Sequence, residues 1–418
     1  MRTRWVVGVL VLLGIIIGAA LATAAEAPKS PELELHGWML TRYYNEVTVD
    51  DTRSTAGEIS DVHRISTWEP AERISLYGTL RFQDGRVGYG EIYVHPWLVE
   101  SDPSYVYLES LYLDVPAGPG AKVRIGKGRN MTFGIAPSYG NRKTSNYSPL
   151  SEAFTMDRVL GVQYLRTNGP DSFGLALLNT QRPGSRYIGQ AADEQMENGF
   201  PTPPVGPGAL ARTTVTHLAD RDTPSNRSSQ LQVSSRFGHQ FRDLNVGLSG
   251  RVGRMDQDDV EFLQDPTKAP AQQRFATYNG DLTISRYGAD ATFKKAPFVV
   301  MSQFYVGRTG NIHNDGWEIV VGVEPSQQCS GFWRELSRAC KGLYVRYGKL
   351  NIDVPRTTNP ITWDSRQLAV SYVLPLKVEG AEFAKWLQFE YESNLEDPPS
   401  GVDEIPNNLF FVELFSAF

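Results

Sequence analysis

Apolar and polar side chains alternate along most of the chain after residue 26, in segments of about ten residues. In 72–82, for example, Ile74 and Leu76 alternate with Arg73 and Ser75. A period of two is that of a β-strand with two different faces, and about ten residues is the length that a tilted strand needs to cross a membrane. A soluble β-sandwich alternates in the same way, so the alternation alone leaves both folds open.

We expect about sixteen antiparallel strands, the number found in large closed barrels. The expected strands are 33–45, 72–82, 89–98, 105–115, 121–130, 158–167, 172–180, 228–237, 243–253, 280–293, 297–308, 316–324, 341–350, 363–375, 385–393 and 407–418. The faces are ambiguous in 33–45, 105–115 and 280–293, where a β-bulge would shift the alternation.

The connections between these strands alternate in length. The long connections are 46–71, 131–157, 181–227, 254–279, 351–362 and 394–406. Short turns follow the other strands, as at 84–86, 117–120 and 168–171, with exceptions at 99–104, 309–315 and 325–340. Long loops at one end and short turns at the other are typical of a transmembrane β-barrel with long external loops and short periplasmic turns. A sandwich has no reason to sort its loops in this way.

The N-terminal residues predict export. Arg2 and Arg4 precede an apolar run over 5–22, and small residues follow at 22–25. This order of charged, apolar and small residues is that of a signal peptide, which we expect to be 1–25, leaving one mature domain over 26–418. The alternative is an uncleaved membrane anchor. Export and a barrel together predict location in an outer membrane.

Charge and motifs exclude several functions. Lys and Arg number 41 and Asp and Glu 47, a net charge of −6, so no general basic surface for nucleic acid is expected. The six histidines are scattered, and the chain has no Walker loop, His-Glu-x-x-His or Gly-x-Ser-x-Gly motif. We therefore expect no catalytic residues, no metal site and no cofactor.

The two cysteines are close together in the sequence. Cys329 and Cys340 are the only cysteines of the chain, which excludes a multi-cysteine metal site. In an exported protein such a pair predicts a disulfide, which would stabilise the fold by about 3 kcal/mol on the chain-entropy model.

The C-terminal strand carries a further signal. Phe418 shares a face with Phe410, Val412 and Leu414, and only Ser416 interrupts the apolar pattern. A terminal aromatic residue on such a strand resembles the signal that outer-membrane barrels present to their assembly machinery. With the signal sequence and the paired long and short connections, the chain resembles a sixteen-stranded Gram-negative-type porin.

A shorter stretch narrows this resemblance. Residues 105–133 are similar to part of the phosphate-selective and related substrate-specific porins, but the loop lysines and arginine ladder of that family have no residue-by-residue match here. The general resemblance implies contact with outer-membrane lipids and a possible homotrimer. It also implies that the third external loop, here 131–157, folds inward and narrows the lumen.

The face opposite the apolar one would line a water-filled pore. Its predicted pore-lining charges are Arg73, Arg81, Lys122, Arg124, Arg236, Arg251, Arg346, Glu318, Glu390, Glu392 and Glu413. The basic residues come mostly from the first half of the chain and the acidic ones from the last third. Opposed walls of unlike charge would set up a transverse field across the lumen. The alternative is that these charges pair with one another.

The loop 131–157 lies in the most basic part of the chain. It contains Arg142 and Lys143, which we also predict to line the pore, and a helix start at 148–149. Residues 122–166 hold eight basic and two acidic residues. Inside the lumen this surplus would favour anions, whereas at the rim it would bind lipid phosphate groups.

The function predicted from these features is passive diffusion of small hydrophilic solutes, with a mild preference for anions. Two other barrels remain open: a sheath that holds a partner protein such as a cytochrome, and a barrel enzyme whose site would include residues such as His36 and His63. A soluble β-sandwich that binds glycans is a further alternative.

Overall fold

The first strand, β1 (Glu32–Thr48), pairs with β2 (Ser66–Arg81) along one edge and with the last strand, β19 (Asn407–Ala417), along the other. In the computed structural model the sheet therefore closes on itself as an antiparallel barrel. The structure describes residues 31–48, 66–94, 106–136, 143–144, 147–155, 158–179, 182–187, 216–221, 230–254, 281–310, 312–324, 331–332, 335, 340–354, 361–362, 364–376, 384–397 and 407–418.

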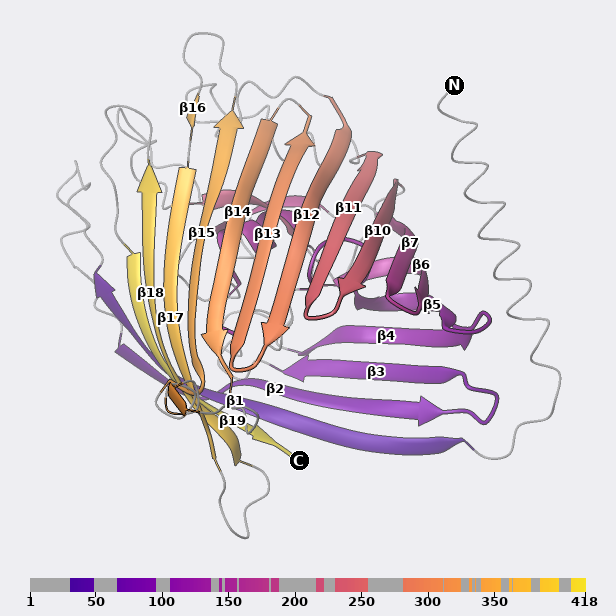
Figure 1. The fold of residues 1–418 in the computed structure, drawn as a ribbon, viewed down its shortest axis with the longest axis horizontal. Coiled ribbons are helices and arrows are strands. Elements are labelled where there is room, and N and C mark those ends of the chain that lie inside the picture. The colour runs from indigo at the N-terminus through magenta and orange to yellow at the C-terminus, as the bar shows by residue number, and fades with distance from the viewer. Residues whose placement is uncertain are drawn as a thin grey trace.

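The ring continues from β2 through the strands in chain order. These are β3 (Val87–Val94), β4 (Val106–Pro116), β5 (Ala121–Arg129), β6 (Arg158–Asn168), β7 (Asp171–Asn179), β10 (Leu231–Phe241), β11 (Leu244–Arg254), β12 (Thr283–Lys295), β13 (Phe298–Thr309), β14 (Ile312–Val323), β15 (Leu343–Val354), β17 (Asp364–Pro375) and β18 (Ala384–Asp397). Figure 1 shows β10 to β18 side by side as one wall and β1 to β4 as another.

Three shorter strands lie outside this ring of sixteen. β8 (Arg182–Tyr187) and β9 (Thr216–Arg221) form a separate two-stranded sheet, and the two-residue β16 (Ile361–Thr362) pairs with the end of β15. Each of the sixteen predicted strands overlaps one strand of the ring. The predicted all-β antiparallel barrel is confirmed.

One face of the sheet is continuous around the barrel. A row of directly opposed residues runs across nine neighbouring strands: Arg124, Gln163, Ala176, Ser234, Arg251, Arg286, Gly307, Asn314 and Ile352. Directly opposed residues share a face, so this row fixes which side chains point the same way on β5 to β15. We call this side the inner face, because the segment between β5 and β6 packs on it.

The two faces reverse the pattern of a soluble protein. Large apolar side chains of the outer face are exposed, as for Leu248 at 65%. Inner-face polar side chains such as Arg346 and Glu392 are buried. An exposed apolar band around a closed barrel with a polar interior is the arrangement that suits a bilayer. Within the described residues, no helix is long and apolar enough to cross a membrane.

Register irregularities occur in two of the three segments with ambiguous faces. One lies between Leu40 and Arg42 on β1, and the other opposite Glu91 and Ile92 on β4. The second leaves both Glu109 and Ser110 buried on β4, although neighbouring residues of a regular strand point to opposite faces.

The turns follow the predicted order at one end of the barrel. The connections β2–β3, β4–β5, β6–β7, β10–β11 and β12–β13 are short and lie at the end where β1 begins and β19 finishes. At this end Gly37 and Phe418 exchange backbone hydrogen bonds of 2.8 and 2.9 Å. The last residue of the chain thus completes the closure of the barrel.

Candidate functional site

The chain between β5 and β6 turns into the barrel. It contains a short helix, α3 (Pro149–Phe154), which begins at the predicted position. Proline fits the first turn because it has no N–H to satisfy there, and the Ser148 hydroxyl accepts a hydrogen bond of 3.0 Å from the backbone N–H of Ser151. The helix places Leu150 and Phe154 toward the far wall.

An apolar cluster holds this segment to the inner face of β12 to β15. Phe133, Leu150 and Phe154 of the segment are fully buried. Their wall partners are Ile284, Tyr305, Ile312, Leu350 and Ile352. The ring centroid of Tyr305 lies 5.2 Å from that of Phe133 and 5.5 Å from that of Phe154. These apolar side chains of the inner face therefore mark where the segment docks.

Two inner-face glycines make this close approach possible. A Cβ at Gly307 would lie 2.6 Å from Cδ of Arg286 and 2.8 Å from Cε1 of Phe154. One at Gly316 would clash with the backbone oxygen of Lys349 and lie 2.7 Å from Cδ1 of Leu150. Any larger side chain at either position would therefore crowd both the neighbouring strand and the docked segment.

Hydrogen bonds fix the segment along its length. Ser234 Oγ donates to the carbonyl of Thr132 at 2.9 Å, and the N–H of Gly134 donates to Ser249 Oγ at 2.9 Å. The N–H of Ile135 donates to Gln303 Oε1 at 3.2 Å. These contacts carry the segment from β10 across to β13.

Further along, the segment reaches β14 and β15. Arg346 donates to the hydroxyl of Thr144, and Lys143 Nζ lies 3.3 Å from Glu324 Oε1. The described residues 130–136, 143–144 and 147–155 thus lie inside the ring of strands, along one wall.

The opposite wall carries a triad of charges on β4 and β5. Arg124 donates to Asp114 through Nε at 2.7 Å and Nη2 at 3.0 Å, and Lys122 Nζ lies 2.7 Å from Asp114 Oδ2. The Arg124 and Asp114 side chains are nearly buried, whereas that of Lys122 is 44% exposed. One carboxylate between two cations leaves a net charge of +1 facing the lumen.

Other inner-face charges are also paired. Arg236 lies 2.5 Å from Asp290, Arg346 lies 3.5 Å from Glu392, and Arg81 lies 3.2 Å from Glu34. Arg42 lies 2.6 Å from Glu413 and Arg158 lies 2.6 Å from Glu109. These pairs agree with the alternative that the lumenal charges pair with one another. The separation into a basic and an acidic wall stays a prediction.

The remaining predicted pore-lining residues also lie on the inner face. Arg73 lies over the ring of Tyr93 at 5.5 Å and Arg251 over that of Phe133 at 5.5 Å. Glu318 accepts a hydrogen bond of 2.5 Å from Gln303, and Glu390 accepts one of 2.6 Å from Gln388. Arg142 lies outside the described residues.

The other sequence-based expectations fare differently. His36 lies on the inner face with its ring centroid 5.3 Å from that of Tyr77, whereas His63 lies outside the described residues. Cys340 is half-buried and Cys329 lies outside the described residues, so the disulfide stays a prediction. The same holds for the signal peptide 1–25. Within the part of the chain that the structure describes, no group of three or more His, Cys, Asp or Glu side chains is placed to hold a metal ion.

Sequence reasoning missed several inner-face charges. They are Arg42, Glu91, Glu109, Asp114, Arg158, Arg286 and Asp290. Conversely, Lys127 and Arg166 lie on the outer face, although both belong to the basic surplus of 122–166. Each is three residues along its strand from an inner-face residue, Arg124 and Gln163 respectively, and so points to the opposite face. The alternation Tyr89-Glu91-Tyr93 was a signal that could have assigned Glu91 to the inner face. The β-bulge at Glu109 shifts the alternation along β4, so the face of Asp114 could not be assigned from the sequence.

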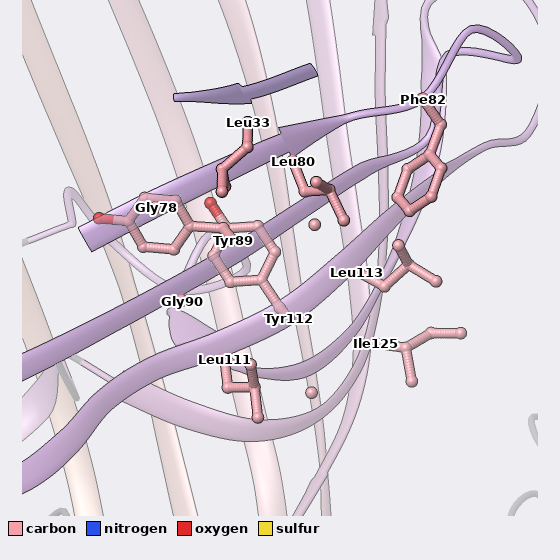
Figure 2. A pocket seen from close by; sticks show the side chains of 12 residues that line it. Leu33, Gly78, Leu80, Phe82, Tyr89, Gly90, Leu111, Tyr112, Leu113 and Ile125 are labelled. Atoms are coloured by element: carbon pink, nitrogen blue, oxygen red, sulfur yellow. The ribbon is translucent and has the colours of Figure 1, made fainter. Parts of the chain in front are cut away.

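A hollow of about 580 Å³ lies beside β1 to β5, mostly on the outer face. Figure 2 shows its lining of Leu33, Leu80, Leu111, Leu113 and Ile125 around Gly78 and Gly90. These leucines are exposed or half-buried and the lining is almost wholly apolar. Tyr89 and Tyr112 also line the hollow, but no charged side chain does, so it offers no charged group to a water-borne solute.

Comparison with known proteins identifies the fold. No family model matches the chain and no curated protein matches it in sequence. Among solved structures, OmpF from Salmonella typhi is similar over 94% of this chain and 100% of its own, with a TM-score of 0.56 and 10% identity.

Two further structures are similar over 93% of this chain and 100% of their own, each at 11% identity. An anion-selective porin from Comamonas acidovorans has a TM-score of 0.48, and the trimer form of OmpT from Vibrio cholerae has a TM-score of 0.49. The conclusion on fold rests on the Salmonella structure, which has the highest score of the three. The described part of the chain therefore has the fold of a sixteen-stranded outer-membrane porin.

Proposed function

We propose that this protein is an outer-membrane channel for passive diffusion of small hydrophilic solutes. The observation that supports this function best is the inverted barrel: an apolar outer face, a polar inner face, and a segment packed along β10 to β15 inside it. Solutes would pass between that segment and the opposite wall of β1 to β5.

The exposure of the inner charges supports a mild preference for anions. Glu390, Glu392 and Glu413 are fully buried, whereas Lys122 is the most exposed member of a triad with net charge +1. The pairs Arg81–Glu34 and Lys143–Glu324 are also exposed, but each is neutral as a pair. The exposed Lys122 and the net positive charge of its triad support this preference.

Single-channel recording in a planar bilayer under a salt gradient tests this function. We expect steady, ohmic current steps and a reversal potential that favours anions. A folded, inserted protein that carries no current would contradict the proposal and would favour a sheath or an enzyme.

The sheath is less consistent with the structure. A barrel that encloses a partner protein needs its lumen for that partner. Here Phe133, Leu150 and Phe154 cover the inner face of β12 to β15, and the segment extends to Glu324. A partner would have to displace a fully buried apolar cluster.

The outer face predicts a depth-dependent effect on stability. Replacing Leu248 near the middle of β11 with arginine should destabilise the folded barrel by about 2–4 kcal/mol in a bilayer, because the charge would face lipid. Leu244→Arg, close to the turn and on the same outer face, should cost about 0–1 kcal/mol. Urea titrations of folding into vesicles measure both. Equal costs at the two positions would contradict a membrane-embedded outer face.

The proposal extends to partners and processing. We propose contact of the outer face with outer-membrane lipids, recognition of the strand that ends at Phe418 by the barrel-assembly machinery, a homotrimer, removal of 1–25 on export, and a disulfide between Cys329 and Cys340.

A further inference from the structure

Aromatic side chains line the inner face on the side opposite the inward segment. They form two adjoining rows that cross six neighbouring strands, from β18 through β19 and β1 to β4. We call these residues the aromatic wall; they are Trp386, Phe415, Trp38, Tyr93, His36, Tyr77, Tyr89 and Tyr112.

The first row contains the two tryptophans. Trp386 stacks on Phe415 with ring centroids 3.8 Å apart and an interplanar angle of 6°. Phe415 lies 5.6 Å from Trp38, and Trp38 meets Tyr93 edge-on at 5.4 Å. One ring from each of β18, β19, β1 and β3 thus forms an unbroken line.

The second row begins next to Trp38 on β1 and ends at a charge. His36 lies 5.3 Å from Tyr77, Tyr77 lies 5.9 Å from Tyr89, and Tyr89 lies 5.1 Å from Tyr112. Figure 2 shows the rings of Tyr89 and Tyr112 next to each other. The Arg124 guanidinium lies 3.7 Å from the Tyr112 ring, so the row leads directly to the triad of Arg124, Lys122 and Asp114.

Register places the second row in the lumen. Tyr77 is directly opposite Glu91, and Tyr112 is two residues from Asp114, which is directly opposite Arg124. Glu91 and Arg124 are both buried inner-face residues. The three tyrosines themselves are half-buried, so part of each residue is accessible.

The ring order of the strands places the aromatic wall across the lumen from the inward segment. The wall spans β18 to β4, and the segment is held by β10, β11 and β13 to β15. A solute that passes between them would move along the aromatic rings.

The aromatic rings and the neighbouring triad together favour a solute that has both a planar ring and a negative charge. A planar ring can stack on or beside tyrosine at centroid distances of about 4.5–7 Å, the spacing already present along the row. An ammonium group has three N–H donors, and the exposed Lys122 gives one of them to Asp114. A carboxylate next to the stacked ring would bind Lys122 and use the net positive charge of the triad.

We propose that the aromatic wall and Lys122 form a binding site for small cyclic carboxylates in transit through the channel. This inference rests on the proposed channel function and adds the solute class to it. Acetate has the charge without the ring, and benzyl alcohol has the ring without the charge, so each should bind more weakly than benzoate.

The test is block of single-channel current of the full-length mature protein by benzoate, acetate or benzyl alcohol. We expect benzoate to reduce the current at the lowest concentration. Tyr89→Leu and Tyr112→Leu should each raise the half-blocking concentration of benzoate about two- to tenfold, the range of aromatic pair energies, and leave that of acetate unchanged. Lys122→Gln should weaken block by benzoate and acetate but not by benzyl alcohol.

Two controls separate a loss of the site from a loss of the fold. Tyr287→Leu removes an exposed tyrosine from the outer face of β12 and should leave benzoate block unchanged. Tyr89→Phe keeps the ring and should also keep the block. Equal block by benzoate and acetate in a conducting wild-type channel would overturn the inference and leave the channel function intact. Absence of any current would overturn the channel function and the inference with it.

Discussion

Replacing Phe133 and Phe154 together with alanine should raise the single-channel conductance and make it fluctuate. Both rings are fully buried against the ring of Tyr305. Each truncation should weaken docking of the inward segment by about 3–5 kcal/mol. The hydrogen bonds that remain, such as those of Thr132 and Gly134, contribute only about 1 kcal/mol each. The segment should therefore leave the wall for part of the time and widen the path.

The control variant is on the opposite face of β13, the strand that carries Tyr305. Phe304→Ala removes an exposed ring next to Tyr305 and should leave the conductance as it is. Gly307→Leu provides an independent route, because its Cβ alone would lie 2.8 Å from Phe154, with the flexible Arg286 side chain at 2.6 Å as its other close neighbour. It should reproduce the wider, noisier channel without loss of an aromatic ring. Unchanged conductance in the double alanine variant would mean that the segment does not limit permeation.

The barrel could be predicted from the sequence because the alternation that indicates it is present within each single strand. Lipid on one side and polar groups on the other impose a period of two on every strand, and this period placed Arg73 and Ser75 on one face. The charge pairs could not be predicted in the same way. Whether Arg236 meets Asp290 depends on how three strands align, which no single strand encodes.

The docking of the inward segment is the hardest feature to predict from the sequence. The basic residues 142–143 favoured an inward loop in the sequence analysis. The contacts that hold the segment to the wall are instead made by its apolar side chains, which pack over two glycines far away in the chain. Gly307 and Gly316 look like ordinary gaps in the alternation of β13 and β14. Their role becomes visible only when Phe154 and Leu150 lie over them.

Selectivity should follow the charge of the Asp114 triad, with opposite signs for its members. Replacing Lys122 and Arg124 with glutamine leaves Asp114 as a net negative charge and should shift selectivity toward cations. Asp114→Asn leaves two cations and should shift it toward anions. A unit charge about 8 Å from a passing ion in a water-like medium changes the energy of that ion by about 0.5 kcal/mol. Anions and cations shift in opposite directions, so each unit charge alters the anion-to-cation permeability ratio by about fivefold.

A substitution of Lys122 alone tests the role of the triad without breaking the buried pair of Arg124 and Asp114. Arg124 and Asp114 are nearly buried, so breaking their bond could also destabilise the wall, whereas Lys122 is 44% exposed. Lys122→Gln alone should therefore shift the reversal potential toward cations without loss of folded protein.

Lys127 supplies the matched control. It lies on the same strand but on the outer face, where Nζ donates to the carbonyl of Leu108. Lys127→Gln changes the net charge of the protein by the same amount as Lys122→Gln and should leave the reversal potential unchanged. If both variants shift it equally, the overall charge of the barrel and not the lumenal triad would set its ion preference.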